Sequence, residues 1–192
     1  SSMGAQVSYY IPDRLSEGFG MNTGAVDLLN SQGITLIVTV DNGTAALREI
    51  EYGKRLGIDV VVTDHHVPGP ELRAAVAVVN PHRREYQGFR ELCGAGVALK
   101  LIAALEGGEY EMPLESFAAL AAIGTIGDVV SLSGENRMIV RKGLEMLPVS
   151  ENAGLRALMT AAGLSGELTA GKVAFGICPR INAPGRMGCA KL

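Results

Sequence analysis

LIVTVDNG at residues 36–43 and DVVVTDHH at residues 59–66 are the two stretches that decide the fold. Each is a β-branched apolar run that ends in polar residues of the types that bind metals. In an open parallel sheet, ligands bind outside the carboxyl ends of the strands. Carboxylate and imidazole groups at that edge are the ligands that Mn²⁺-, Mg²⁺- or Zn²⁺-assisted hydrolysis requires. The two stretches therefore predict an α/β protein with a metal site at one sheet edge.

The rest of the chain predicts strands and helices in alternation, followed by helices alone. Gly57 ends the helix between the two decisive runs, and the length of that helix suits a right-handed parallel crossover. Asn22 is a good N-cap for the first helix. The expected strands are 7–11, 34–40, 59–63 and 75–79, and the expected helices are 22–29, 44–56, 95–105, 114–123, 136–147 and 155–162.

Two segments rich in glycine or proline are expected to interrupt this pattern. Residues 124–128 should break a helix before Val129-Val130, and residues 179–186 carry too much Pro and Gly for regular structure. The sequence therefore predicts one α/β domain over residues 1–192, with a parallel sheet, helices on both faces and a helical second half.

Composition narrows the class of protein. The chain has 192 residues, 47% of them hydrophobic, and no run long enough to span a bilayer. Its three cysteines are far apart and form no C-x-x-C pair, which argues against a zinc or disulfide scaffold and favours a cytoplasmic protein. The net charge of −3 does not favour nucleic acid, but a site of acidic metal ligands becomes electropositive once its cations bind.

Asp41 and the Asp64-His65-His66 triplet are the first candidate site residues. The Asp41 carboxylate could bind a metal or merely close an Asx-turn. Side chains of adjacent residues point opposite ways in an extended backbone, so we expect His65 to be a direct ligand and His66 a phosphate contact or proton donor. Asp64 could orient an imidazole or bind the metal itself. His82 is expected on the surface.

Asp128 is a third candidate ligand. It follows Gly124-Thr125-Ile126-Gly127 and precedes Val129-Val130, and an ionised carboxylate in apolar surroundings needs a partner. That partner could be a metal, a helix N-terminus or a buried arginine. Together with Asp41 and His65, it would complete a mixed carboxylate–imidazole site, which favours manganese.

Two glycine-containing segments are candidates for binding anions. Arg180, Asn182 and Arg186 share a loop that suits a phosphate clamp, although the arginines could instead tie the loop to an acidic face. Gly94-Ala95-Gly96 resembles half of a dinucleotide fingerprint, but Leu99 stands where the third glycine should be. Close helix packing, or an anion at the helix N-terminus, is the better interpretation of these glycines.

Taken together, these motifs resemble the DHH phosphoesterase superfamily and, within it, the branch of bacterial exonucleases specific for single-stranded DNA. Residues 40–43 (VDNG) resemble the second family motif, 64–66 (DHH) the third and 127–130 (GDVV) the fourth. The flanking stretches that also match are 10–14, 17–20, 93–97 and 179–186.

The resemblance implies a centre of two Mn²⁺ (or Mg²⁺) ions that hydrolyses phosphodiesters from the 5′ end of single-stranded DNA in repair and recombination. Asp41 would bridge both ions, His65 and Asp128 would complete one of them, and His66 would lie close to the scissile phosphate. A helicase and a single-strand-binding protein are the implied partners. Two alternatives stay open: a family member that cleaves short oligonucleotides, cyclic dinucleotides or pyrophosphate, and a non-catalytic DNA-binding scaffold.

The family's first motif, a strand ending in Asp-x-Asp upstream of the segment that begins near Val7, has no counterpart in this sequence. The family's C-terminal nucleic-acid-binding domain has none either. We therefore expect residues 1–192 to be an incomplete catalytic core that binds at most one divalent ion well and has little nuclease activity alone.

Overall fold

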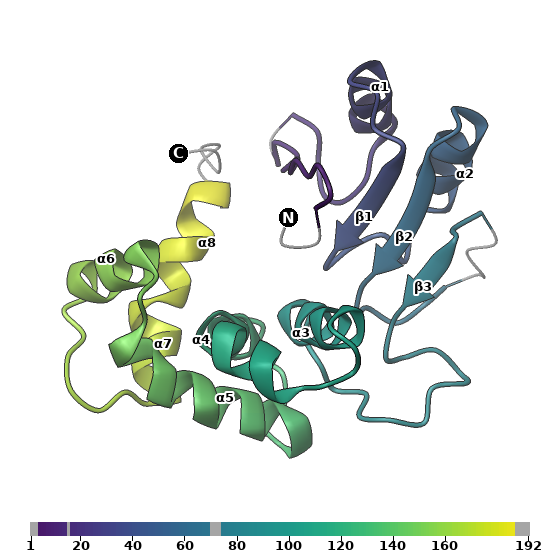
Figure 1. The fold of residues 1–192 in the computed structure, drawn as a ribbon. Helices are drawn as coiled ribbons and strands as arrows, with labels where there is room; N and C mark the ends of the chain where they lie inside the picture. The colour runs from purple at the N-terminus through teal and green to yellow at the C-terminus, as the bar shows by residue number, and fades with distance from the viewer. Residues whose placement is uncertain (1–3, 15, 70–73, 187–192) are drawn as a thin grey trace.

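The computed structural model describes residues 4–14, 16–69 and 74–186 of the chain. A sheet with two helices behind it forms one half of the molecule, and a group of helices forms the other (Figure 1). The elements are α1 (Thr23–Ser31), β1 (Leu36–Val40), α2 (Leu47–Arg55), β2 (Asp59–Thr63), β3 (Ala77–Val79), α3 (Gly94–Leu105), α4 (Glu111–Gly127), α5 (Gly134–Met146), η1 (Leu147–Val149), α6 (Ala153–Ala161), α7 (Ala170–Gly176) and α8 (Cys178–Arg186).

The sheet is parallel and its strands lie in the order β1-β2-β3. Leu36 pairs with Asp59, and Val61 pairs with Ala77. The predicted strand–helix–strand crossover and the α/β class are therefore confirmed. Because the three strands run the same way, their carboxyl ends meet at one edge of the sheet, the edge nearest α3 in Figure 1.

Helices cover the two faces of the sheet unequally. On one face, Val60 and Val62 are buried against Ile50 of α2. On the other face, Val79 at the end of β3 packs against a buried cluster that includes Val97 and Leu99 of α3. This second face is open along β1, where the side chains of Leu36, Val38 and Val40 are 52%, 45% and 55% exposed.

The helical half has its own core. α4 and α5 pack closely because Gly143 of α5 lies directly against Ala118 and Ala122 of α4. Val173 of α7 and Ile177 are fully buried in the same cluster. Among the described residues, no helix combines the length and the apolar character needed to cross a membrane.

Three expectations about individual elements are wrong. Residues 7–11 form no strand, because they pair with no neighbouring strand and remain largely exposed. α4 runs through Gly124 without a break, since that glycine serves a close contact with Ala95 of α3. Residues 179–186 belong to helix α8 although Pro184 lies inside it; Pro179 lies in the first turn, where a missing N–H costs no helical hydrogen bond.

Candidate metal centre

Two neighbouring strands deliver the first site residues to the carboxyl edge of the sheet. β1 ends at Val40 and β2 ends at Thr63, and these residues pair in the parallel register. Asp41 follows β1 with a φ of 62°, and its N–H donates to the Thr63 carbonyl oxygen at 3.0 Å. His65 follows β2. The structure thus brings a carboxylate and an imidazole together from residues that are 24 positions apart in the chain.

The turn after β1 is closed by Asn42, not by Asp41. Asn42 Nδ2 donates to the Val40 carbonyl oxygen at 2.9 Å, and Thr39 Oγ1 donates to the Asn42 carbonyl oxygen at 2.7 Å. The Asp41 carboxylate is therefore left to face His65, and the alternative of a merely structural Asx-turn at Asp41 does not apply.

The third candidate ligand comes from the helical half. Asp128 is the C-cap of α4, and its Oδ2 lies 3.5 Å from His65 Nε2. Asp41 Oδ1 lies 3.0 Å from the same nitrogen. The expectation that Asp128 is buried in apolar surroundings is wrong, because its side chain is 39% exposed and faces the cluster.

His65 Nε2 carries the strongest signal of a cation site. This buried atom has two carboxylates within reach, yet no hydrogen bond of acceptable geometry satisfies it among the residues that the structure describes. A buried polar atom without a partner is costly. An imidazole nitrogen flanked by two carboxylates suits a divalent cation, and the mixed oxygen and nitrogen donors suit Mn²⁺.

Asp64 supports the cluster from behind. Its side chain is 2% exposed, Oδ2 accepts from the Thr44 N–H at 3.0 Å, and Oδ1 accepts from the His65 and His66 N–H groups at 2.8 and 3.2 Å. Burial raises the pKa of Asp64, but the hydrogen bonds from Thr44 and His66 outweigh it and lower the pKa to about 2. With both oxygens occupied in this way, Asp64 is an ionised group that orients the histidines.

Two residues that hold this arrangement, Thr44 and Asn80, have no role in the expectations from the sequence. Asn80, which follows β3 at the same sheet edge, is 5% exposed. Its Nδ2 donates to Thr44 Oγ1 at 3.1 Å and to the His66 carbonyl oxygen at 2.8 Å. The signal that identifies Asp41, a polar residue directly after an apolar strand, also applies to Asn80.

His66 lies beside His65 rather than pointing away from it. The two ring centroids are 4.5 Å apart, because residues 64–66 have left the extended strand. The argument from opposite side-chain directions therefore does not hold here. His66 Nδ1 lies 2.7 Å from Asp64 Oδ1, and this hydrogen bond raises the pKa of the exposed imidazole. Ligand atoms of Asp41, His65 and His66 all lie within 4.8 Å of one another.

The pKa of Asp41 is also affected by burial and by the charged groups around it. Burial raises the pKa of Asp41, His65 lowers it, and the nearby Asp128 carboxylate raises it again. Two carboxylates held around one unpartnered imidazole repel each other unless a proton or a cation lies between them. A divalent cation would relieve this repulsion, and its binding would release protons.

The remaining predicted site residues lie elsewhere. Arg180 donates from its Nη1 and Nη2 atoms to the carbonyl oxygens of Gly176 and Ala161, so its guanidinium ties helices together. Asn182 is exposed on α8, and the side chain of Arg186 lies outside the described part of the chain. The phosphate clamp therefore stays a prediction.

The Gly94-Ala95-Gly96 motif opens α3, as the close-packing interpretation predicts. A Cβ atom built on Gly96 would lie 3.0 Å from Leu92 Cδ2. A Cβ atom on Gly94 would lie 2.5 Å from Cγ of Asp41, so the helix begins directly against the candidate ligand. No sequence pattern connects these two residues.

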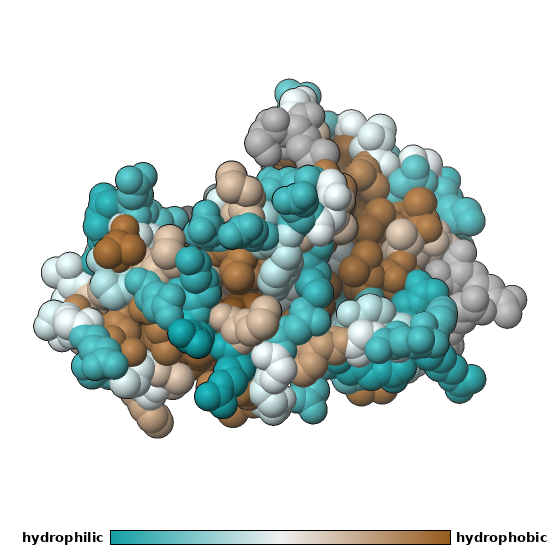
Figure 2. All heavy atoms as spheres, turned by 60° about the horizontal axis from the view of Figure 1, so that its bottom comes forward, coloured by the Kyte–Doolittle hydropathy of each residue, from teal (hydrophilic) through white to brown (hydrophobic). Residues whose placement is uncertain are grey.

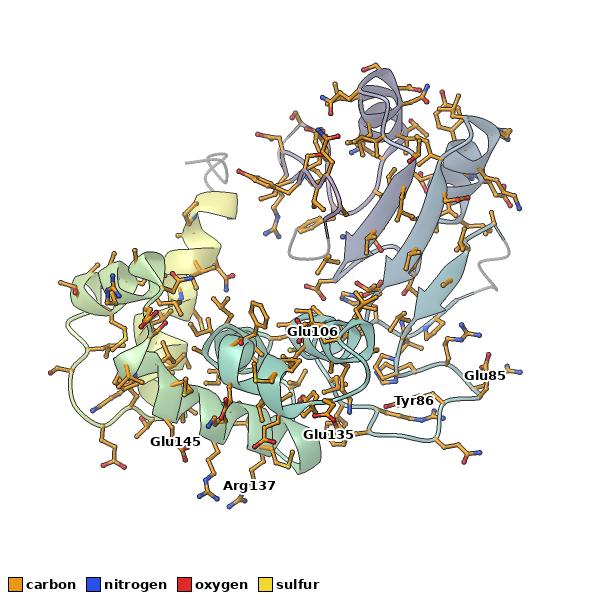
Figure 3. The ribbon with its side chains drawn as sticks, in the orientation of Figure 1. Glu85, Tyr86, Glu106, Glu135, Arg137 and Glu145 are labelled. Carbon is orange, nitrogen blue, oxygen red and sulfur yellow. The ribbon has the colours of Figure 1, made fainter. Side chains whose placement is uncertain are left out.

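One hollow lies next to β3, near the site, and another lies along α5, away from it. A cavity of about 400 Å³ next to β3 is lined by apolar residues and by the polar or charged residues Asn80, Arg83, Glu85, Tyr86 and Lys100. Figure 2 shows hydrophobic side chains gathered on the right, the half of the molecule that holds the sheet. A groove of about 640 Å³ runs along α5 between Arg137 and Glu145, whose side chains point outward in Figure 3. Neither of these two hollows is lined by the three candidate ligands.

Comparison with known proteins gives one family. Residues 1–125 match the DHH family, N-terminal domain. The single-stranded-DNA-specific exonuclease RecJ of Bacillus subtilis (strain 168) is 46% identical over 187 residues, which are 96% of this chain and 23% of that protein. The exonuclease of the same name from Escherichia coli (strain K12) is 35% identical over 95% of this chain and 34% of its own length.

Solved structures agree with the sequence comparison. The crystal structure of an exonuclease RecJ bound to manganese matches with a TM-score of 0.86 and 39% identity, over 99% of this chain and 48% of that chain. RecJ of Thermus thermophilus in complex with Mn²⁺ matches with a TM-score of 0.75 and 38% identity, over 88% of this chain and 26% of that one.

Proposed function

The chain belongs to the DHH family, and on that premise we propose that it is the metal-binding part of the catalytic core of an exonuclease that degrades single-stranded DNA from the 5′ end. The names of its relatives support this substrate. The chain spans only 23% and 34% of the two relatives described above, so the activity belongs to a longer polypeptide of that kind. We place that polypeptide in the cytoplasm, with a role in DNA repair and recombination.

The observation that carries the proposal is the unpartnered Nε2 atom of His65, flanked by Asp41 and Asp128. These three residues would hold Mn²⁺, or Mg²⁺ in its place, and Asp41 would be shared with a second ion in the complete enzyme. Bound cations of this kind activate a water molecule and stabilise the charge that develops on phosphate oxygens.

His66 and Asp64 would act on the phosphate. The buried, ionised Asp64 accepts a hydrogen bond from His66 Nδ1, which fixes the ring and favours its protonated form. The side chain of His66 is 63% exposed, so its Nε2 is available to a substrate. We assign His66 the role of hydrogen-bond or proton donor to the scissile phosphate, and Asp64 the role of orienting it.

Two further assignments follow from the family resemblance. Arg180, Asn182 and Arg186 would contact substrate phosphates, which requires Arg180 to exchange its present carbonyl partners for the substrate. A helicase that supplies single strands and a single-strand-binding protein are the proposed partners.

The test is Mn²⁺-dependent release of nucleotides by the full-length polypeptide from single strands labelled at the 5′ or the 3′ end. We expect release from the 5′ end, and a loss of more than ~100-fold in His65→Ala, because a metal ligand is gone. His82→Ala is the matched control, since that histidine lies outside the cluster and should leave the rate unchanged.

Three results would contradict the proposal. Release from the 3′ end would overturn the direction. Cleavage of short oligonucleotides or cyclic dinucleotides alone would point to another substrate class. Single strands that are bound but never cleaved would favour a scaffold.

A further inference from the structure

We infer that Gly94 is a positioning residue for Asp41, and that the first turn of α3 sets the separation between Asp41 and Asp128. This inference deepens the proposed function and rests on it, because it assumes that the two carboxylates act on a common cation. It concerns a residue that donates no ligand atom.

Gly94 is in direct contact with the candidate ligand. A Cβ atom built on this residue would lie 2.5 Å from Asp41 Cγ and 2.6 Å from Asp41 Cβ. Distances of this size are far below van der Waals contact. The φ of Gly94 is not in the left-handed region, so its backbone does not require glycine. The space taken by the Asp41 side chain is what excludes any larger residue.

Asp41 has no room to yield to a side chain at position 94. Rotation of its carboxylate would not help, because its Cβ atom is itself too close. Its backbone is held by the hydrogen bond to the Thr63 carbonyl oxygen and already has a left-handed φ of 62°. A side chain at position 94 would therefore displace either the end of β1 or the start of α3.

The start of α3 is fixed on its other side by α4. A Cβ atom on Gly124 would lie 2.5 Å from Cβ of Ala95, so these two helices are already at their closest approach. Cys93 Sγ also lies 3.4 Å from Thr125 Oγ1 of α4. Asp128, the C-cap of α4, follows Gly124 by four residues.

The first turn of α3 is thus held between the end of β1 and the last turns of α4. Two close contacts lie on either side of this turn: Gly94 touches Asp41, and its neighbour Ala95 touches Gly124, which lies four residues before Asp128. His65 Nε2 lies between those carboxylates, 3.0 Å from one and 3.5 Å from the other. An added methyl group at position 94 would increase the separation between the Asp41 and Asp128 carboxylates. The affinity of the site for a cation would fall as a result.

The test measures two quantities on the 192-residue chain: the affinity for Mn²⁺ by electron paramagnetic resonance, and the Tm in metal-free buffer. We expect Gly94→Ala to weaken Mn²⁺ binding more than ~10-fold, because sub-ångström changes at a metal ligand have effects of this size. Gly96→Ala, in the same helical turn, meets only a flexible leucine side chain and should change the affinity less than ~2-fold.

The metal-free Tm separates this inference from the proposed function. Gly94→Ala should lower the Tm by about 6 °C, because overpacking destabilises a protein of this size by that order. In an Asp41→Gly background the same substitution should cost less than about 2 °C, since the clashing side chain is gone and glycine suits the φ of 62°.

Each outcome decides the inference. Wild-type Mn²⁺ affinity in Gly94→Ala would overturn it, and so would an equal loss of Tm in both backgrounds. If Gly94→Ala does not fold, recovery of a folded double variant supports the contact, and failure of the double variant refutes it. If the wild type binds no Mn²⁺, the proposed function fails while the metal-free comparison still tests the contact.

Discussion

Asp64 shows how a single buried charge can be stable because it is completely hydrogen-bonded. Burial alone would favour its neutral form, yet the hydrogen bonds from Thr44 and His66 hold it ionised and lower its pKa to about 2. Since its pKa is lowered on folding, Asp64 contributes stability above its ordinary pKa, and this contribution is lost as the pH falls from about 4 towards 2.

Asp64→Asn should therefore destabilise the protein at neutral pH by about 2 kcal/mol. The reason is that the amide has only one oxygen to accept the hydrogen bonds that two carboxylate oxygens accept in the wild type. Urea unfolding at pH 7 and at pH 3 measures this. The penalty should shrink at the lower pH, where the wild type begins to lose the same charge. A penalty that does not depend on pH would contradict the account.

Tyr110 is the opposite case, because its buried hydroxyl group has no hydrogen-bond partner among the described residues. Burial, with a smaller effect of Glu135, raises the pKa of Tyr110 to about 12. Tyr110→Phe should raise the free energy of unfolding by about 1 kcal/mol, because it removes an unsatisfied polar group. Tyr52→Phe is the control, since the Tyr52 hydroxyl donates to Asp27 and its removal should bring no gain.

The candidate ligands can be predicted from the sequence, whereas the roles of Thr44 and Asn80 beside them cannot. Asp41 follows β1 directly and His65 is the second residue after β2, so a rule about strand ends finds them. Thr44 is a common turn residue, and Asn80 is marked only by its place directly after β3; their contacts across 20 and 36 positions in the chain are what reveal their roles. A contact between distant residues leaves no local pattern.

At the scale of the helices and strands, close packing explains why a glycine in the sequence led to a wrong prediction of where a helix ends. The strand at Asp59–Thr63 is predicted with its correct bounds, because a buried parallel strand is an uninterrupted apolar run. The prediction that a helix breaks at Gly124 follows from the poor helix propensity of glycine. In the structure Gly124 lies inside α4, where the lost propensity is offset by the approach of α3.

Gly143 provides the sharpest test of this packing. A methyl group there would collide with the Ala118 backbone carbonyl of α4, which has no rotamer to change. Gly143→Ala should therefore cost about 3 kcal/mol in unfolding free energy, near the upper end for overpacking. Gly171→Ala in α7 meets only a contact at 3.9 Å and should be neutral or stabilising. Equal effects of the two substitutions would contradict the close approach of α4 and α5.

At the scale of the whole molecule, helices cover one face of the sheet and leave the β1 part of the other face exposed. Parallel sheets are normally covered on both faces, yet Leu36, Val38 and Val40 stand in the open here. Val38→Thr should change the Tm of the 192-residue chain by less than about 1 °C, whereas Val62→Thr on the covered face should lower it by several degrees. A comparable loss for both would show that the β1 face is covered in solution.

The packing of the two halves of the molecule explains why the candidate ligand Asp128 is harder to identify from the sequence than Asp41 and His65. Asp41 and His65 come from the sheet half, but Asp128 is brought to them by α4 of the helical half. The site therefore depends on how the two halves pack through α3, which periodicity does not reveal.

Titration of the chain with Mn²⁺, followed by electron paramagnetic resonance, tests the central claim that the sheet edge holds a divalent cation. We expect one ion to bind tightly, His65→Ala to weaken binding more than ~100-fold, and His82→Ala to bind as the wild type does. No saturable binding, or unchanged binding by His65→Ala, would contradict the account.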